Sequence, residues 1–137
     1  MDDIRWKQRF ENFSRAFNLL RSALEERPLD SFSDLEQEGI IQRFKYTYAL
    51  AWKTFKDYLE GSGLTIVPGT PRQVIKEAFS AGIIDDGPLW NDIMLHRNLL
   101  SHTYDMAKFR EVLDAVVERY LAAFEKVHAW FLSRVSE

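Results

Sequence analysis

The sequence of 137 residues contains no cysteine, only six glycines and four prolines, and no long apolar run. The absence of cysteine excludes disulfides, thiolate metal sites and cysteine nucleophiles, and it fits a reducing compartment. The scarcity of glycine and proline argues against an all-β or disordered chain. No apolar run approaches the ~20 residues that a membrane helix needs, and the charged N-terminus has no apolar signal core. We therefore expect a cytoplasmic protein with no membrane association.

An excess of positive charge is also lacking, since the net charge is −3. A protein that grips nucleic acid over a broad surface by counterion release needs many unpaired cations. Any contact with RNA must therefore be local, or shared with another chain. Apolar and aromatic residues, in contrast, are abundant at 46% and 14%. They are enough for one core, and the length predicts a single helical domain over residues 1–137.

Apolar residues recur at helical spacing through most of the chain, which predicts three long and two shorter amphipathic helices. The economical arrangement is an all-α, antiparallel up-and-down bundle of about five helices. An extended connector over residues 64–69 is expected between the second and third helices. The predicted helices are residues 4–26, a helix of ~28 residues that Ser33 caps and Gly61 ends, a helix opening at Thr70–Gln73, a helix after Asp85–Pro88, and residues 106–135 behind the N-cap Asp105.

Several local signals carry expectations of their own. Ser33 with Glu36, and Thr70 with Gln73, have the spacing of capping boxes. In the third helix we expect Phe79 to face the core, and in the last helix we expect the same of Val117. The aromatic residues of the second helix lie at core spacing, except for Tyr46.

The densest group of chemically capable side chains is residues 97–104, Arg-Asn-Leu-Leu-Ser-His-Thr-Tyr. On one α-helix Arg97 and His102 would point about 140° apart. The helix must therefore end between them, or the two groups must meet counterparts from another subunit. Arg97 could stabilise a phosphoryl oxygen and His102 could move a proton near neutral pH. Together they suffice for metal-free cleavage of RNA, with the substrate 2′-OH as nucleophile.

A plainer interpretation of the same residues stays open. Arg97 would pair with Asp92 or Asp105 at the surface, and His102 would cap a helix end. Of the other histidines, we expect His96 to be exposed and not catalytic. His128 should be structural. Three histidines without His-x3-His spacing do not predict a metal site, and nothing in the sequence predicts a cofactor.

Residues 97–104 resemble the R-x4-H-x-Y motif of the HEPN superfamily. The similarity covers almost the whole chain and points to the branch called nucleotidyltransferase substrate-binding proteins. The further segments that carry it are residues 42–53, 57–59, 72–78 and 82–84, followed by Trp90 and Met94. The resemblance implies a HEPN-type helical bundle, a homodimer that sets two copies of the motif near each other, and a minimal nucleotidyltransferase encoded nearby.

The resemblance also implies roles for individual residues. In the HepT-type toxins of this branch the motif acts on RNA, and the partner enzyme silences the toxin by transferring AMP to the motif tyrosine. Carried over by position, Arg97 would bind the scissile phosphate and His102 would serve in acid–base chemistry. Tyr104 would be the modification site, with Asn98 and Ser101 in supporting positions.

The second helix departs from the family pattern at Lys45 and Ala49, where acidic residues are expected. This departure and the acidic net charge favour an alternative, a non-catalytic subunit that presents a substrate or nucleotide to a nucleotidyltransferase. A third interpretation is a chain that only dimerises and blocks its partner.

Overall fold

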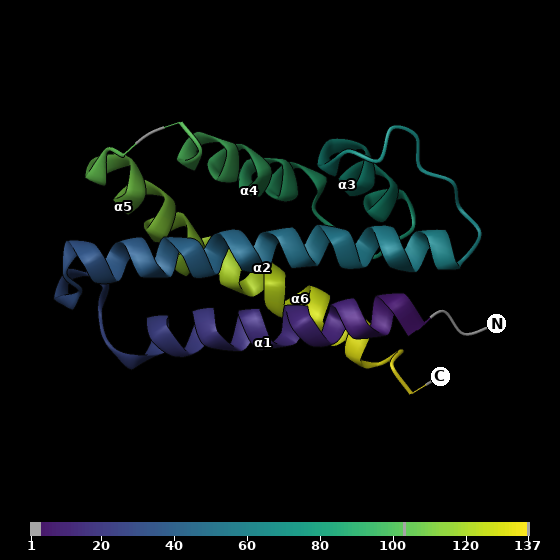
Figure 1. The fold of residues 1–137 in the computed structure, drawn as a ribbon, viewed down its shortest axis with the longest axis horizontal. Coiled ribbons are helices and arrows are strands. Elements are labelled where there is room, and N and C mark those ends of the chain that lie inside the picture. The colour runs from purple at the N-terminus through teal and green to yellow at the C-terminus, as the bar shows by residue number, and fades with distance from the viewer. Residues whose placement is uncertain (1–3, 103, 137) are drawn as a thin grey trace.

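The computed structural model describes residues 4–102 and 104–136, and within them every regular element is a helix (Figure 1). Helices α5, η2 and α6 follow one another without a break and form one rod, so the described residues form five helical rods, as predicted. The elements are α1 (Ile4–Glu26), the 3₁₀ turn η1 (Leu29–Ser31), α2 (Asp34–Gly61), α3 (Pro71–Ser80), α4 (Gly87–Leu100), α5 (Met106–Ala115), the π-helical turn η2 (Val116–Tyr120) and α6 (Leu121–Leu132).

Helix α2 is central to the arrangement (Figure 1). The antiparallel helix α1 packs along one side of it, α3 and α4 lie on the other side, and the rod α5–η2–α6 crosses behind. The core between them is largely aromatic, as the composition predicts, and burying each such side chain stabilises the fold by roughly 1.5–3 kcal/mol. The largest fully buried side chains are Tyr120, Phe13, Phe17, Phe44, Phe55, Phe124 and Phe131.

One of the two predicted capping boxes forms. At the start of α2, Ser33 Oγ accepts from the Glu36 N–H at 3.2 Å, and Glu36 Oε1 accepts from the Ser33 N–H at 2.9 Å. At the start of α3, Thr70 accepts from the Gln73 N–H, but the Gln73 side chain donates forward to Glu77 at 3.1 Å. The second box is therefore wrong, because a carboxylate one turn ahead competes for the amide.

Two residues expected in the core lie at the surface. Phe79 is 50% exposed, because Val74, Ile75 and Ala78 already cover the inner face of the short helix α3. Val117 is 45% exposed because it falls in the π-helical turn, whose wider spacing keeps Val116 and Tyr120 inside and turns Val117 outward.

The C-terminal helix is also shorter than predicted, since α6 ends at Leu132 and not at residue 135. The connector between α2 and α3 has no regular structure, as expected, and buries Ile66.

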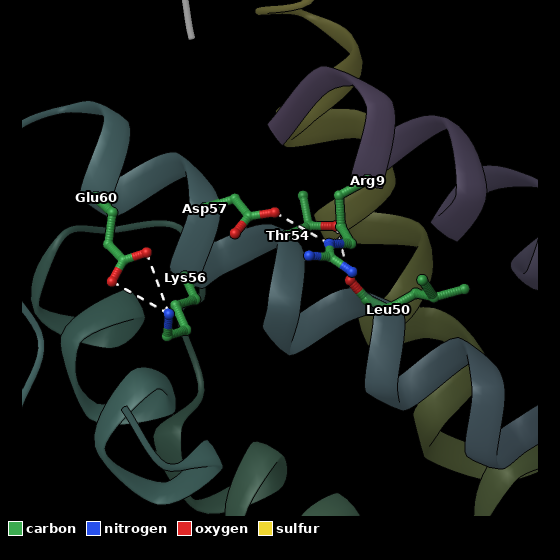
Figure 2. A network of polar contacts seen from close by, with 6 residues as sticks. All are labelled: Arg9, Leu50, Thr54, Lys56, Asp57 and Glu60. Carbon is green, nitrogen blue, oxygen red and sulfur yellow. Dashed lines mark hydrogen bonds and ion pairs between the residues drawn. The ribbon is translucent and has the colours of Figure 1, made fainter. Parts of the chain in front are cut away.

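A partly buried ion pair joins α1 to α2 (Figure 2). Arg9 Nε donates to Asp57 Oδ2 at 3.0 Å, and Asp57 is nearly inaccessible to solvent. A buried carboxylate is costly without a cation, so Arg9 allows Asp57 to lie at this interface. Lys56 and Glu60 pair at 3.2 Å elsewhere on α2. Asp57 thus has a structural role within a segment that carries the family resemblance.

Across the two described ranges, no helix combines the length and apolarity needed to cross a membrane.

Candidate functional site

The motif occupies the junction between α4 and α5. Helix α4 ends at Leu100, and the N–H groups of Ser101 and His102 donate to Asn98 and Leu99 carbonyl oxygens, each at 3.1 Å. Helix α5 then begins at Met106, where the Asp105 side chain accepts from the Ala107 N–H at 2.8 Å. The expected helix end between Arg97 and His102 is therefore confirmed.

Arg97 lies on the last turn of α4, and its side chain is half-buried. Its guanidinium Nη1 donates to Ser101 Oγ, one turn ahead. Asp92, one of the carboxylates expected to pair with it, instead accepts from Arg119 Nη1 at 3.2 Å. Among the described residues no carboxylate lies within ion-pair distance of Arg97, so its charge is available to an anionic ligand.

His102 and Tyr104 are accessible from solvent. His102 is exposed, and its imidazole bonds to no other described residue. Tyr104 is 93% exposed. Thr103, between them, lies outside the described residues. No hydrogen bond joins Arg97 to either side chain in the described chain, so one chain presents the three groups along an open junction. The roles of Arg97, Asn98, Ser101, His102 and Tyr104 stay predictions.

Helix α2 brings one further cation, Lys45, to this junction, and Arg72 at the start of α3 lies near enough to act on Tyr48 of α2; the sequence alone indicated neither contact. The pKa of Lys45 is lowered by burial and by the positive charge of Arg97. Burial raises the pKa of the Tyr48 hydroxyl well above its usual range, although Arg97 and Arg72 oppose this. Tyr48 is 3% exposed, and its hydroxyl has no hydrogen-bond partner within the described chain. A protein of net charge −3 therefore has a local positive cluster beside α4.

The expectation that His96 is exposed is wrong. Its Nδ1 lies 2.6 Å from the Tyr120 hydroxyl, and its Nε2 lies 3.5 Å from Glu111 Oε2. Burial raises the pKa of Tyr120 to about 12, so this phenol stays protonated at neutral pH. Arg119 reaches the same hydroxyl at 3.4 Å. Tyr120 is the last residue of the π-helical turn in another helical rod. Helical spacing within the sequence therefore could not predict that Tyr120 contacts His96.

His128 has the structural role predicted for it. Its Nε2 lies 3.1 Å from Ser14 Oγ, and its ring packs against Phe10, Phe13 and Phe17 of α1. Burial lowers its pKa, which is the usual result for an imidazole among apolar rings.

A pocket of about 370 Å³ opens beside the motif, between α2 and the α4–α5 junction. It is lined by Glu38, Ile41, Gln42, Lys45, Leu100, Ser101, Tyr104 and Phe109. Lys45, where the sequence departs from the family pattern, thus lines the same pocket as the motif residues Ser101 and Tyr104.

Comparisons with known proteins agree with this architecture. Residues 8–131 match the family described as "Nucleotidyltransferase substrate binding protein like". A protein named "Probable ribonuclease HepT", from Haemophilus influenzae, is 31% identical over 87 residues, which cover 58% of this chain and 60% of that relative. A crystal structure of a protein from Thermus thermophilus superposes with a TM-score of 0.68 and 28% identity, covering 91% of this chain and 99% of the other.

Proposed function

Because this chain belongs to the nucleotidyltransferase substrate-binding protein family, in the HEPN and HepT-type branch, we propose that it is the ribonuclease toxin of a toxin–antitoxin pair. Its partner would be a minimal nucleotidyltransferase encoded nearby. The observation that carries the proposal is the α4–α5 junction. There the Arg97 guanidinium, which has no carboxylate partner among the described residues, lies one turn before the exposed imidazole of His102.

The cleavage step needs only groups of this kind. The 2′-OH of the substrate attacks the adjacent phosphorus as His102 takes its proton, and the bond from phosphorus to the 5′-oxygen breaks. The leaving oxygen takes a proton from an imidazolium, which leaves a cyclic 2′,3′-phosphate and a 5′-hydroxyl. Arg97 would stabilise the charge that develops on the phosphoryl oxygens. In a homodimer, the second copy would supply a second imidazole to share the two proton transfers.

Silencing would act on Tyr104. The phenolic oxygen attacks the α-phosphorus of ATP, pyrophosphate leaves and the phenolic proton is lost. The product adds a bulky, negatively charged phosphodiester beside the cations that RNA requires. The 93% exposure of Tyr104 suits it to entering the active site of another enzyme.

The test of the nuclease is cleavage of RNA by the purified protein in the presence of a chelator. We expect His102→Ala to abolish cleavage, because it removes the group that moves the proton. The fold should survive, since the imidazole is exposed and bonds to no other described residue. Tyr46→Phe, a change at an exposed residue of α2, is the matched control and should cleave as the wild type does. Equal cleavage by His102→Ala and the wild type would exclude the mechanism.

The test of the silencing step is incubation with the neighbouring nucleotidyltransferase and ATP. Mass spectrometry should show added AMP units of ~329 Da each, and Tyr104→Phe should not gain them. Modification of the Phe variant to the same extent would show that Tyr104 is not the acceptor.

A second function, a non-catalytic subunit that holds a nucleotide for the transferase, is favoured by the pocket beside Ser101 and Tyr104 and by the net charge of −3. Expression in cells separates the two. A toxin stops growth when expressed alone and is relieved by its neighbour, whereas a docking subunit is harmless in both cases. We also expect a cytoplasmic homodimer, which light scattering of the purified protein would reveal as twice the chain mass of 16.1 kDa.

A further inference from the structure

The pocket beside the motif has one wall made by a single stripe of α2. Glu38, Ile41, Gln42 and Lys45 are spaced by three, one and three residues, so they share one face of the helix. The opposite wall comes from the α4–α5 junction and the first turn of α5. We name this feature the α2–junction pocket.

The walls combine an apolar interior with a few polar groups. Ile41, Leu100 and Phe109 are buried and form apolar surface. Gln42 offers both a donor and an acceptor, whereas the Glu38 carboxylate can only accept. Sites for small ligands usually have this composition, with volumes of ~300–1,000 Å³. At about 370 Å³ the pocket suits one planar ring system with polar edges, such as a nucleobase.

The stripe of α2 carries a negative charge at one end, on Glu38, and a positive charge at the other, on Lys45. Glu38 and Lys45 are seven residues apart, or about 10 Å along the helix axis. Neither has an ion-pair partner among the described residues, although Lys56 and Glu60 of the same helix pair with each other. A ligand that complements the stripe therefore has a hydrogen-bond donor at one end and an anion at the other.

The cationic end of the stripe continues into the motif. Ser101 lines the pocket with Lys45, and its Oγ accepts from Arg97. An anion at the rim would thus lie near the Lys45 ammonium and could replace Ser101 as the partner of the Arg97 guanidinium. Charge-assisted bonds of this kind are the usual way to hold a phosphate.

From these contacts we propose that the α2–junction pocket binds one nucleotide unit, with its base between Ile41 and Phe109 and its phosphate at Lys45 and Arg97. The Glu38 carboxylate selects bases that carry an amino group, namely adenine, guanine and cytosine, over uracil. Binding of a nucleotide is inferred from the pocket alone, and only the origin of that nucleotide rests on the proposed function. That source is a residue of the RNA beside the scissile bond or the AMP attached to Tyr104.

A second pocket of about 350 Å³ offers a contrast. It lies between the turn before α4 and helix α6, and its cations Lys126 and Arg119 are already paired with Asp85 and Asp92 at 3.2 Å. Among the described residues that line it, no cation is therefore left to hold a phosphate. The α2–junction pocket differs from this second pocket because its lining cation, Lys45, has no carboxylate partner among the described residues.

The experiment is calorimetric titration of the full chain carrying His102→Ala with AMP, GMP, CMP and UMP in turn. We expect the first three to bind at least ~5-fold more tightly than UMP. Lys45→Ala should weaken all four by ~10-fold or more, as expected for the loss of a bond to a charged group. Lys53→Ala removes an exposed lysine of the same helix that does not line the pocket, and it should leave the affinities unchanged.

Glu38→Gln sharpens the test, because an amide can donate to the carbonyl oxygen of uracil. In this variant UMP should bind more tightly than to the parent protein, and the preference for amino bases should shrink. The proposal is overturned if all four nucleotides bind equally to the parent protein, or if Lys45→Ala binds them as tightly as Lys53→Ala does.

Two further measurements identify the source. For RNA, the variant Gln42→Trp fills the pocket from its exposed rim, and it should cleave more slowly than the wild type and lose the base preference of the wild type. For AMP on Tyr104, the modified protein should no longer bind free AMP. If the wild type binds nucleotides as described but cleaves no RNA, the nuclease proposal fails and the pocket stands. If it cleaves RNA while Lys45→Ala binds nucleotides normally, the pocket fails and the nuclease stands.

Discussion

Two histidines six positions apart show how differently α4 and its C-terminal junction are built. The His96 ring lies against the C-terminal rod, 2.6 Å from the buried Tyr120 hydroxyl and 3.5 Å from Glu111. We call these three residues, together with Arg119, the closed region. His102 follows the last turn of α4 and is exposed, and its imidazole has no bond to another described residue. The first imidazole joins two helices, and the second is available to a ligand. The fold therefore decides whether an imidazole is held in packing contacts or left accessible to a ligand.

The largest effect that tests this comparison is expected for Arg97→Ala. Arg97 has no carboxylate partner among the described residues, so its loss should leave the fold intact. Cleavage of RNA should fall by ~10²–10³-fold, the range seen when a group that stabilises transition-state charge is removed. Initial rates of cleavage of a labelled RNA give the measurement.

The matched control is Arg119→Ala, since Arg119 belongs to the closed region, where it pairs with Asp92. It should cleave within a few-fold of the wild type. Equal losses from the two substitutions would mean that the two regions are not functionally distinct.

An intermediate effect is expected for Tyr120→Phe, which breaks the closed region. The substitution removes the hydroxyl that His96 and Arg119 contact, and it leaves a partly buried ring nitrogen without that partner. The free energy of unfolding should fall by about 1–2 kcal/mol. Urea denaturation followed by circular dichroism measures the change.

Tyr46→Phe removes an exposed hydroxyl and should leave the free energy of unfolding unaltered. Cleavage by folded Tyr120→Phe should match the wild type. A folded Tyr120→Phe protein without activity would show instead that the closed region takes part in catalysis.

The smallest effect concerns His128, which shares the packing role of His96. Burial lowers its pKa below the ordinary value of 6.5; Glu125 opposes this and Arg21 adds to it. The unfolded chain therefore binds more protons than the folded chain as the pH falls below 6.5, and stability declines in that range. His128→Gln should flatten this decline between pH 7 and 5.5 by under ~1 kcal/mol, because partial exposure screens the shift.

The measurement is the free energy of unfolding across this pH range for the wild type and His128→Gln. His102→Gln is the control, since an exposed imidazole has no buried environment to lose. An identical pH slope for the wild type and His128→Gln would contradict the role given to burial.

Much of the fold was predictable because its signals are local. The box of Ser33 and Glu36 and the N-cap Asp105 are read from neighbouring residues, and both form in the structure. Two of the predictions that failed, the second capping box and the burial of Val117, did so because a nearby group or a local change of helix type altered the expected contacts. Gln73 had the Glu77 carboxylate within reach, and Val117 fell in a π-helical turn that apolar spacing does not reveal.

The sequence by itself determined the helical rods, the aromatic core and the break between Arg97 and His102, because each depends on residues within a few turns of one another. Only the tertiary structure decided which groups surround that break. Lys45 and Gln42 lie more than fifty positions before the motif, and their place in its pocket follows from the packing of α2 against the α4–α5 junction. His96 likewise owes its place to a contact with Tyr120, 24 residues further on. Spacing along a helix specifies one face of that helix, and only packing determines what that face contacts.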